Sequence, residues 1–296
     1  MSTYSVDGIP LDHPNGLWTL QQGTGRRPFP GARGVEIPLA GRAGEIPVAG
    51  DTIEPLETTT LGFTFLVRGR APWGGAGNEE DLEHNLEALA AVLSPHGRLV
   101  DLRHHIGGDM IRQTDAKFIS SSEPELLAGA NAARVTMLAR IPGVYWRDVP
   151  ELTHTWSAGL LDETARAIPA LSGCTAPIPD AVLRVKGPAT NPALSDTASG
   201  GTVAYTGTIS SGQFLLLDCA ALTATRVTTD TWSPTGGTDV TGNVDATGPG
   251  SAYRWLHLTP RIHAADPLSR LIQVSGTATG TSDASGLAVR ARRSFR

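Results

Sequence analysis

Glycine and proline interrupt this sequence so often that few long helices can form. The chain of 296 residues contains 34 glycines and 21 prolines, the residue types that end helices and build turns. The apolar runs between them are short, which is typical of strands joined by tight turns. A chain of this length usually forms more than one hydrophobic core. We therefore predict a mainly β protein with two β-rich domains.

The first half shows the clearest strand pattern of the chain. Apolar residues alternate with smaller or polar ones between Thr60 and Gly69, the period of two that buries one face of a strand. The buried set is Leu61, Phe63, Phe65 and Val67. Further strands are expected at 98–104, 111–120 and 133–141. Residues 35–55 predict an edge hairpin around a turn at 41–44, because their prolines cannot pair inside a sheet.

One segment predicts a helix, from Glu79 to Leu93. Asn78 is a good N-cap, and Glu79, Glu80 and Asp81 lie where the helix dipole favours acids. Pro95 and Gly97 are expected to end the helix. Its apolar stripe has helical spacing and consists of Leu82, Leu86, Leu89 and Leu93. Core packing explains this stripe best, and contact with a neighbouring subunit is the alternative.

This helix on antiparallel strands predicts an α+β domain, a β-sandwich or split barrel plus helix, over residues 1–147. Residues 148–296 predict a second domain, a β-sandwich, from short strands separated by turn residues. The expected strands are 181–186, 203–209, 213–219, 254–258, 271–276 and 287–292. The Thr-, Gly- and Asp-rich stretch 223–250 is expected to form a mobile loop or an exposed ribbon.

The formal net charge of −5 comes entirely from residues 51–150, which carry 14 acids and nine bases. The densest basic cluster is Arg290, Arg292 and Arg293, too short to follow a phosphate backbone, so specific nucleic-acid binding is not expected. The first residues lack a secretory signal, and no apolar run could span a bilayer. We expect synthesis in the cytoplasm and no membrane partner.

No motif in the sequence nominates a catalytic residue. Nucleophile elbows, phosphate loops, zinc-protease motifs and paired Cys-x-x-Cys motifs are absent. His104, His105 and Asp109 come nearest to a metal site, but neighbours on a strand point to opposite faces. Asp239, Asn243 and Asp245 do not match a calcium loop. We expect no enzyme activity, no cofactor and no metal, while a carboxylate pair for glycoside cleavage stays open as an alternative.

Two other residue types leave alternatives open. Six tryptophans could supply a stacking platform for sugars, although such residues more often anchor a core or an interface. They are Trp18, Trp73, Trp146, Trp156, Trp232 and Trp255. The two cysteines, Cys174 and Cys219, could form one disulfide but are too few for a four-cysteine zinc site.

The order of these features resembles the distal tail proteins of long-tailed bacteriophages. In the first half the resemblance rests on Val35–Pro38, Gly41–Gly44, the strand from Thr60, the helix from Glu79, and Ala139–Trp146. In the second half it rests on Ala181–Pro192 and Gly212–Asp218, which resemble strands of a galectin-like sandwich. The chain departs from the pattern at Arg261, where a glycine is expected, and in its long Thr-rich loop.

The resemblance implies a structural role without catalysis. It implies a hexameric ring formed by the first domain, with the hairpin as its belt, connecting the tail tube to the tail tip or baseplate of the virion. Implied partners are the tail tube protein, the tail-tip hub proteins and the tape measure protein. DNA would pass through the channel without specific binding, repelled by acids if these line it. A carbohydrate-binding module for host attachment is the alternative function.

Overall fold

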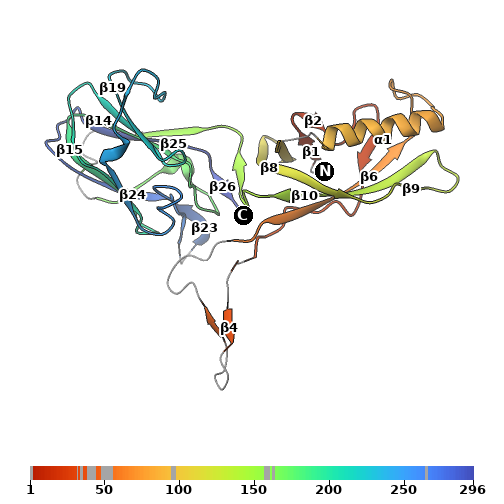
Figure 1. The fold of residues 1–296 in the computed structure, drawn as a ribbon, viewed down its shortest axis with the longest axis horizontal. Helices are drawn as coiled ribbons and strands as arrows, with labels where there is room; N and C mark the ends of the chain where they lie inside the picture. Colours follow the sequence, from red (N-terminus) through yellow and green to blue (C-terminus); the bar gives the residue numbers. More distant parts are fainter. Residues whose placement is uncertain are drawn as a thin grey trace. The chain divides into compact units, whose positions relative to one another are not determined.

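The computed structural model divides into two compact units, Met1–Val149 with Arg296, and Pro150–Phe295 (Figure 1). It describes residues 3–31, 33, 36–38, 45–47, 56–94, 98–156, 161, 164–263 and 266–296. The fold is mainly β with a single helix among these residues, which confirms the expected fold class. Each unit is described here by itself.

Unit 1 is built from an antiparallel sheet in the strand order β2-β1-β7-β8-β10-β6-β3, with β9 on β10 and β11 on β8. The strands are β1 (Thr3–Val6), β2 (Ile9–Pro10), β3 (Trp18–Leu20), β6 (Thr59–Arg68), β7 (Val100–Gly107), β8 (Met110–Ser121), β9 (Glu125–Leu126), β10 (Ala132–Ile141) and β11 (Trp146–Asp148). The predicted strands of the first half are therefore confirmed within a few residues.

The sheet of unit 1 curls because β8 changes partners along its length. Its first part pairs with β7 through Ala116, and its last part pairs with β10 from Lys117 onward. A strand that passes from one layer to another makes a corner and lets the layers face each other. The rings of Tyr4 in β1 and Phe63 in β6 accordingly lie 5.1 Å apart, although three strands separate them in the sheet order.

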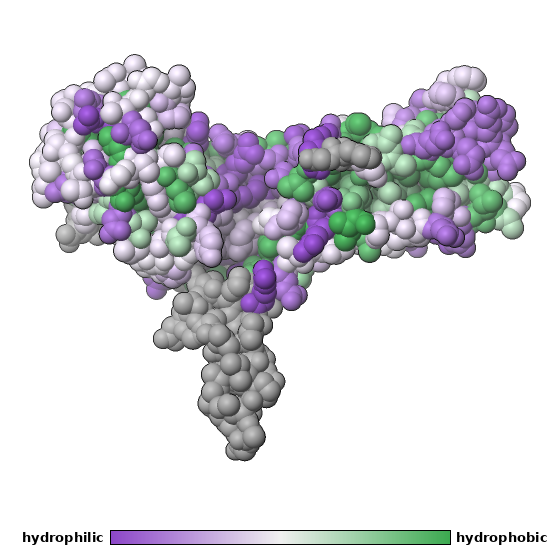
Figure 2. Space-filling view, in the orientation of Figure 1, coloured by the Kyte–Doolittle hydropathy of each residue, from purple (hydrophilic) through white to green (hydrophobic). Residues whose placement is uncertain are grey.

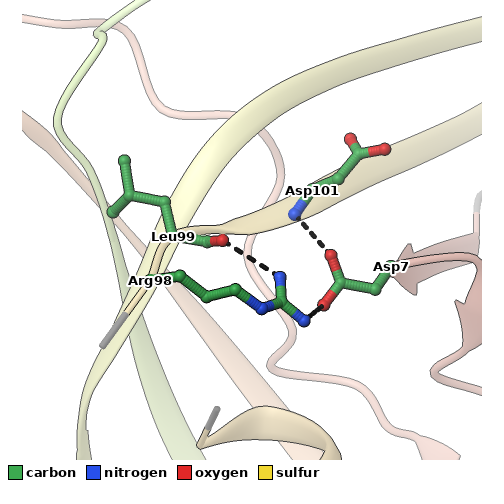
Figure 3. A network of polar contacts seen from close by, with 4 residues as sticks. All are labelled: Asp7, Arg98, Leu99 and Asp101. Carbon is green, nitrogen blue, oxygen red and sulfur yellow. Dashed lines mark hydrogen bonds and ion pairs between the residues drawn. The ribbon is translucent and has the colours of Figure 1, made fainter. Parts of the chain in front are cut away.

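A tight turn joins β1 to β2 and fastens them to the start of β7 (Figure 3). Asp7 and Gly8 both have positive φ, 50° and 83°, as a two-residue hairpin turn requires. The Asp7 carboxylate accepts a hydrogen bond from the Asp101 backbone N–H at 2.9 Å and from Arg98 at 2.7 Å. The hydrogen bond from Arg98 is the main cause that lowers the pKa of Asp7.

The expected edge hairpin appears as two short antiparallel strands, β4 (Glu36–Pro38) and β5 (Glu45–Pro47), which pair with each other. Its expected turn at 41–44 lies outside the described residues, as do Pro95 and Gly97, the expected stop of the helix.

Unit 2 contains two antiparallel sheets, of order β12-β25-β14-β18-β19-β20 and β13-β24-β15-β16-β21, with β17 on β15. The first sheet consists of β12 (Leu152–Trp156), β14 (Val182–Lys186), β18 (Phe214–Asp218), β19 (Thr223–Val227), β20 (Thr238–Asp239) and β25 (Gly286–Ala291). The second consists of β13 (Arg166–Ala167), β15 (Ala189–Asp196), β16 (Thr202–Tyr205), β17 (Thr208–Ile209), β21 (Val244–Thr247) and β24 (Gln273–Thr279).

Both sheets bury apolar residues in one shared core, so unit 2 is a β-sandwich. Leu183, Leu217 and Val289 come from the first sheet, and Leu194 and Val274 from the second. The remaining elements are short: β22 (Arg261–His263) pairs with β23 (Asp266–Leu271), and β26 is Ser294–Phe295. Two 3-10 turns, Pro169–Leu171 and Thr241–Asn243, complete the unit.

Two predictions for unit 2 are wrong. Residues 254–258 form no strand and contribute only one bridge, between Ile178 and Leu258. The backbone N–H groups of Trp255 and Leu258 bond to Cys219 O and Ile178 O on two different segments, so no ladder with one neighbouring strand forms. For the stretch 223–250 the mobile-loop alternative is wrong, because β19 and β21 within it pair with β18 and β16. The exposed-ribbon alternative agrees with β20 and β21, whose residues are exposed or half-buried.

Candidate assembly surface

Large exposed hydrophobic side chains concentrate in unit 1. Of the twelve found among the described residues, nine belong to unit 1: Ile9, Phe29, Trp73, Leu99, Ile106, Met110, Ile119, Leu126 and Leu138. Figure 2 shows hydrophobic residues exposed along the part of the molecule that contains α1, β8 and β10. Exposed apolar surface of this kind marks contact sites for other proteins.

The helix α1 (Glu79–Leu93) forms with the expected bounds and the expected N-cap. The Asn78 side chain accepts a hydrogen bond from the Asp81 backbone N–H, and the Asp81 carboxylate accepts one from the Asn78 backbone N–H, both at 2.9 Å. This reciprocal capping satisfies two N–H groups that have no partner within the helix. The beginning of α1 is therefore fixed.

A buried asparagine fastens α1 to the end of β6. Asn85 donates hydrogen bonds to the backbone oxygens of Arg68 at 2.8 Å and Arg70 at 2.9 Å. The expected apolar stripe is confirmed as core at Leu82, Leu89 and Leu93, and Leu86 is only half-buried. Sequence reasoning missed Asn85, whose signal was its place between two residues of the apolar stripe.

Leu86 lines a groove of about 270 Å³ where α1 faces β8 and β10, named here the α1 groove. Its lining is mainly apolar: Leu86, Leu89, Ala90, Pro124, Val135 and Met137, with Glu87, Ser121 and Ser122. The helix beside it carries five acids and neither Lys nor Arg. The α1 groove thus combines an apolar floor with a negative surrounding.

A second exposed feature of unit 1 is the Phe29 segment, Arg26–Gly31. The Phe29 side chain is 86% exposed. The chain is anchored on both sides of it, because the Gly25 N–H bonds to Gly62 O at 2.7 Å and Gly31 O accepts from the Glu57 N–H at 2.8 Å. Tyr4 also donates its hydroxyl to Gly25 O at 3.2 Å. The ends of the segment are held, so Phe29 has a defined position.

Beneath the Phe29 segment lies a buried histidine. The ring of His104 stacks on that of Tyr4 at 4.3 Å between centroids. Burial, followed by the charges of Arg27, His105 and Arg26, lowers the pKa of His104 to about 4. Burial raises the pKa of Tyr4 to about 12. Both rings are therefore neutral at pH 7.

A buried ion pair joins β8 to β11 in the same unit. Arg112 and Asp148 form this pair, and their side chains are 9% and 3% exposed. Removing one member of a buried ion pair strongly destabilises a protein, because the charge of the other member stays buried without compensation. Sequence reasoning missed the pair, since 36 residues separate its members.

The structure does not bring the candidate metal ligands together. His104 points into the core, whereas Nε2 of its neighbour His105 lies 3.0 Å from the Ser5 hydroxyl. Asp109 is an exposed turn residue. Asp239 accepts from the Thr241 N–H, and Asp245 lies on β21. Within the described parts of the chain, no group of three His, Cys, Asp or Glu residues could hold a metal ion.

The six tryptophans do not form a common platform. Trp18, Trp146 and Trp255 are buried, and Trp73 is 79% exposed in unit 1. Trp156 lines a pocket of about 290 Å³ on the first sheet of unit 2. Beside it Trp232 packs against two guanidinium groups, those of Arg184 at 4.5 Å and Arg290 at 5.2 Å, which occupy its face.

The two cysteines of unit 2 form no disulfide. Cys174 and Cys219 are both buried. Burial raises the pKa of Cys219 to about 12, so this thiol stays protonated and unreactive at neutral pH. Across the described ranges, no helix is long and apolar enough to cross a membrane.

The structure is thus a mainly β protein of two units, and the unit that contains α1 exposes most of the large hydrophobic side chains found at the described surface. No family model and no curated protein matches the chain. Among solved structures, it is similar to the SPP1 Dit protein, described as a paradigm of the hub adsorption apparatus in phages that infect Gram-positive bacteria. The TM-score is 0.61 at 15% identity, covering 99% of both chains. At this identity the likeness shows that the two proteins share a fold.

Two structures of the phage P2 baseplate in its activated conformation, with Ca and with Sr, also match 99% of this chain and 98% of theirs. Their identity is 10%, and the TM-scores are 0.38 and 0.41.

Proposed function

We propose that this chain is a structural protein of a bacteriophage tail, a distal tail hub subunit without catalytic activity. The observation that carries the proposal is the shared fold with SPP1 Dit over 99% of both chains, which includes both units and not a single common domain. A fold alone does not define a function. The second support is therefore the exposed hydrophobic surface of unit 1, since a subunit of an assembly must present such a surface.

The finer parts of the proposal concern the assembly. Six copies form a ring through residues 1–147, and residues 148–296 form a galectin-like domain that holds other tail proteins. The ring connects the tail tube to the tail tip or baseplate, with the tape measure protein and the DNA in its channel. Closed rings arise from heterologous contacts, in which one surface meets a different surface of the neighbour. No cofactor or metal takes part.

The test is the mass of the purified protein over a concentration series, with negative-stain images of the same samples. We expect a species of six chains that appears as a six-fold ring with a central hole. A compact monomer at every concentration would contradict the proposal. In that case a glycan array would test the carbohydrate-binding alternative, which the tail-protein fold does not favour.

A further inference from the structure

We propose that the Phe29 segment of one copy docks onto α1 of the next copy, with the Phe29 ring seated in the α1 groove. The occupant of the groove is thus a second copy of this chain. The inference rests on the proposed function, because it names the contact through which copies meet in the ring. It also assigns the acids of α1 to a contact between subunits.

The α1 groove fits an occupant with an apolar tip and positive flanks. Its floor is apolar, with Leu89, Val135 and Met137 among its lining residues. Glu87 belongs to the groove itself, and Glu83 is exposed one turn earlier on the same helix. Burying an aromatic ring on this floor would remove apolar surface of both partners from water.

The Phe29 segment has these properties. Its ring is 86% exposed, and Arg26 and Arg33 on either side of it are exposed as well. Pro28 and Pro30 flank the ring directly and restrict the backbone. With both ends held by hydrogen bonds to residues near β6, little conformational freedom would be lost on docking. The segment therefore matches the groove in its apolar tip and in its charge.

The two surfaces lie on opposite sides of β6. The α1 groove lies on the side of β10 and β8, and β10 pairs with β6 along its full length. The chain leading to Phe29 follows the other edge of β6, where the N–H groups of Gln21 and Gly25 bond to Thr64 O and Gly62 O. Two different surfaces on opposite sides of β6 can repeat as a heterologous contact from copy to copy, and a ring forms where the rotation between copies closes.

The first experiment compares the self-association of three proteins by sedimentation equilibrium over a concentration series. Phe29→Ala removes the ring from an exposed position, so the fold is unaffected. We expect its dissociation constant to rise at least about 30-fold, as for a buried aromatic anchor of an interface. The matched control is Tyr253→Ala, which removes an aromatic side chain of unit 2 that is 79% exposed. We expect this control to associate like the unchanged protein.

The second experiment mixes two defective variants. Ala90→Arg places a bulky cation in the α1 groove at an exposed helix position, where arginine is well tolerated. Alone, it should associate as poorly as Phe29→Ala. Mixed in equal amounts, the two should form a one-to-one heterodimer, because the Phe29 segment of one variant fits the intact groove of the other. That pair cannot grow, since its remaining groove and segment are both defective.

Cross-linking locates the contact directly. Gly31→Cys lies two residues from Phe29 at an exposed position and keeps the ring in place. Gly31→Cys and Ala90→Cys, mixed and treated with a short bifunctional maleimide, should yield a cross-linked dimer at a higher rate than a mixture that also carries Phe29→Ala. The native Cys174 and Cys219 are buried and stay unmodified. A ring that persists unchanged in Phe29→Ala would overturn this inference and leave the proposed function intact. An unchanged protein that stays monomeric throughout would overturn both.

Discussion

Unit 1 and unit 2 differ in the interactions that they bury. The core of unit 2 is mainly aliphatic, is shared by two facing sheets, and has one fully buried acid, Asp196, beside it. Unit 1 buries a histidine, an asparagine and an ion pair, and among the described residues it carries nine of the twelve exposed large hydrophobic side chains. In unit 1, buried hydrogen bonds and an ion pair connect the elements of the fold, while part of its apolar surface stays exposed. This difference is the reason that we place the proposed assembly contacts in unit 1.

The largest expected effect tests the buried ion pair of unit 1. Arg112→Leu leaves the Asp148 carboxylate buried without its partner, so the free energy of unfolding of unit 1 should fall by about 3–5 kcal/mol. Urea unfolding followed by hydrogen exchange of each unit measures this. The double variant Arg112→Leu with Asp148→Leu should recover most of the loss, because no lone charge remains. If the single variant has the same free energy of unfolding as the unchanged protein, the buried ion pair does not stabilise unit 1.

Next comes the aliphatic core of unit 2. Leu217 is 1% exposed, and Leu217→Ala creates a cavity that should lower the free energy of unfolding of unit 2 by about 2–5 kcal/mol. Unit 1 should keep its own hydrogen-exchange protection. The matched control is Leu268→Ala at an 80% exposed position of the same unit, for which we expect almost no change. Equal losses in both variants would contradict the shared core.

A pH dependence should reveal the contribution of His104 to the stability of unit 1. The pKa of His104 is about 4 in the folded chain and about 6.5 when unfolded. Between these values the unfolded state binds more protons, so stability falls as pH drops from 6.5 to 4, by about 3 kcal/mol for this group. Unfolding midpoints measured across this range in the unchanged protein and in His104→Phe should show a flatter dependence for the variant. Identical slopes would remove His104 as the cause.

The smallest effect concerns the cap of α1. Asn78→Ala removes the side chain that accepts the Asp81 N–H, which should lower the free energy of unfolding of unit 1 by about 1 kcal/mol. Asn78→Ser keeps a capping oxygen and should behave like the unchanged protein. Thermal unfolding followed by the helical circular dichroism signal measures both variants. A loss in the serine variant as large as in alanine would point to a role other than capping.

Local patterns predicted the parts of this fold that local chemistry controls. The bounds of α1 follow from Asn78 and the leucine spacing, and the alternation around Phe63 predicts β6. The Asp7–Gly8 turn carried an equally clear signal that was missed. The strand predicted at 254–258 is absent because the backbone there bonds to Cys219 and Ile178 on two distant segments and not along one strand. Alternation cannot report such contacts.

The sequence by itself determined the class of fold, the single helix among the described residues, and the lack of a catalytic motif, because these depend on residue type and on spacing along the chain. Only the tertiary structure decided which side chains meet. It paired Arg112 with Asp148, stacked His104 on Tyr4, and exposed Phe29 on one side of β6 with the α1 groove on the other. These relations join positions tens of residues apart, and the curl of the sheet sets them.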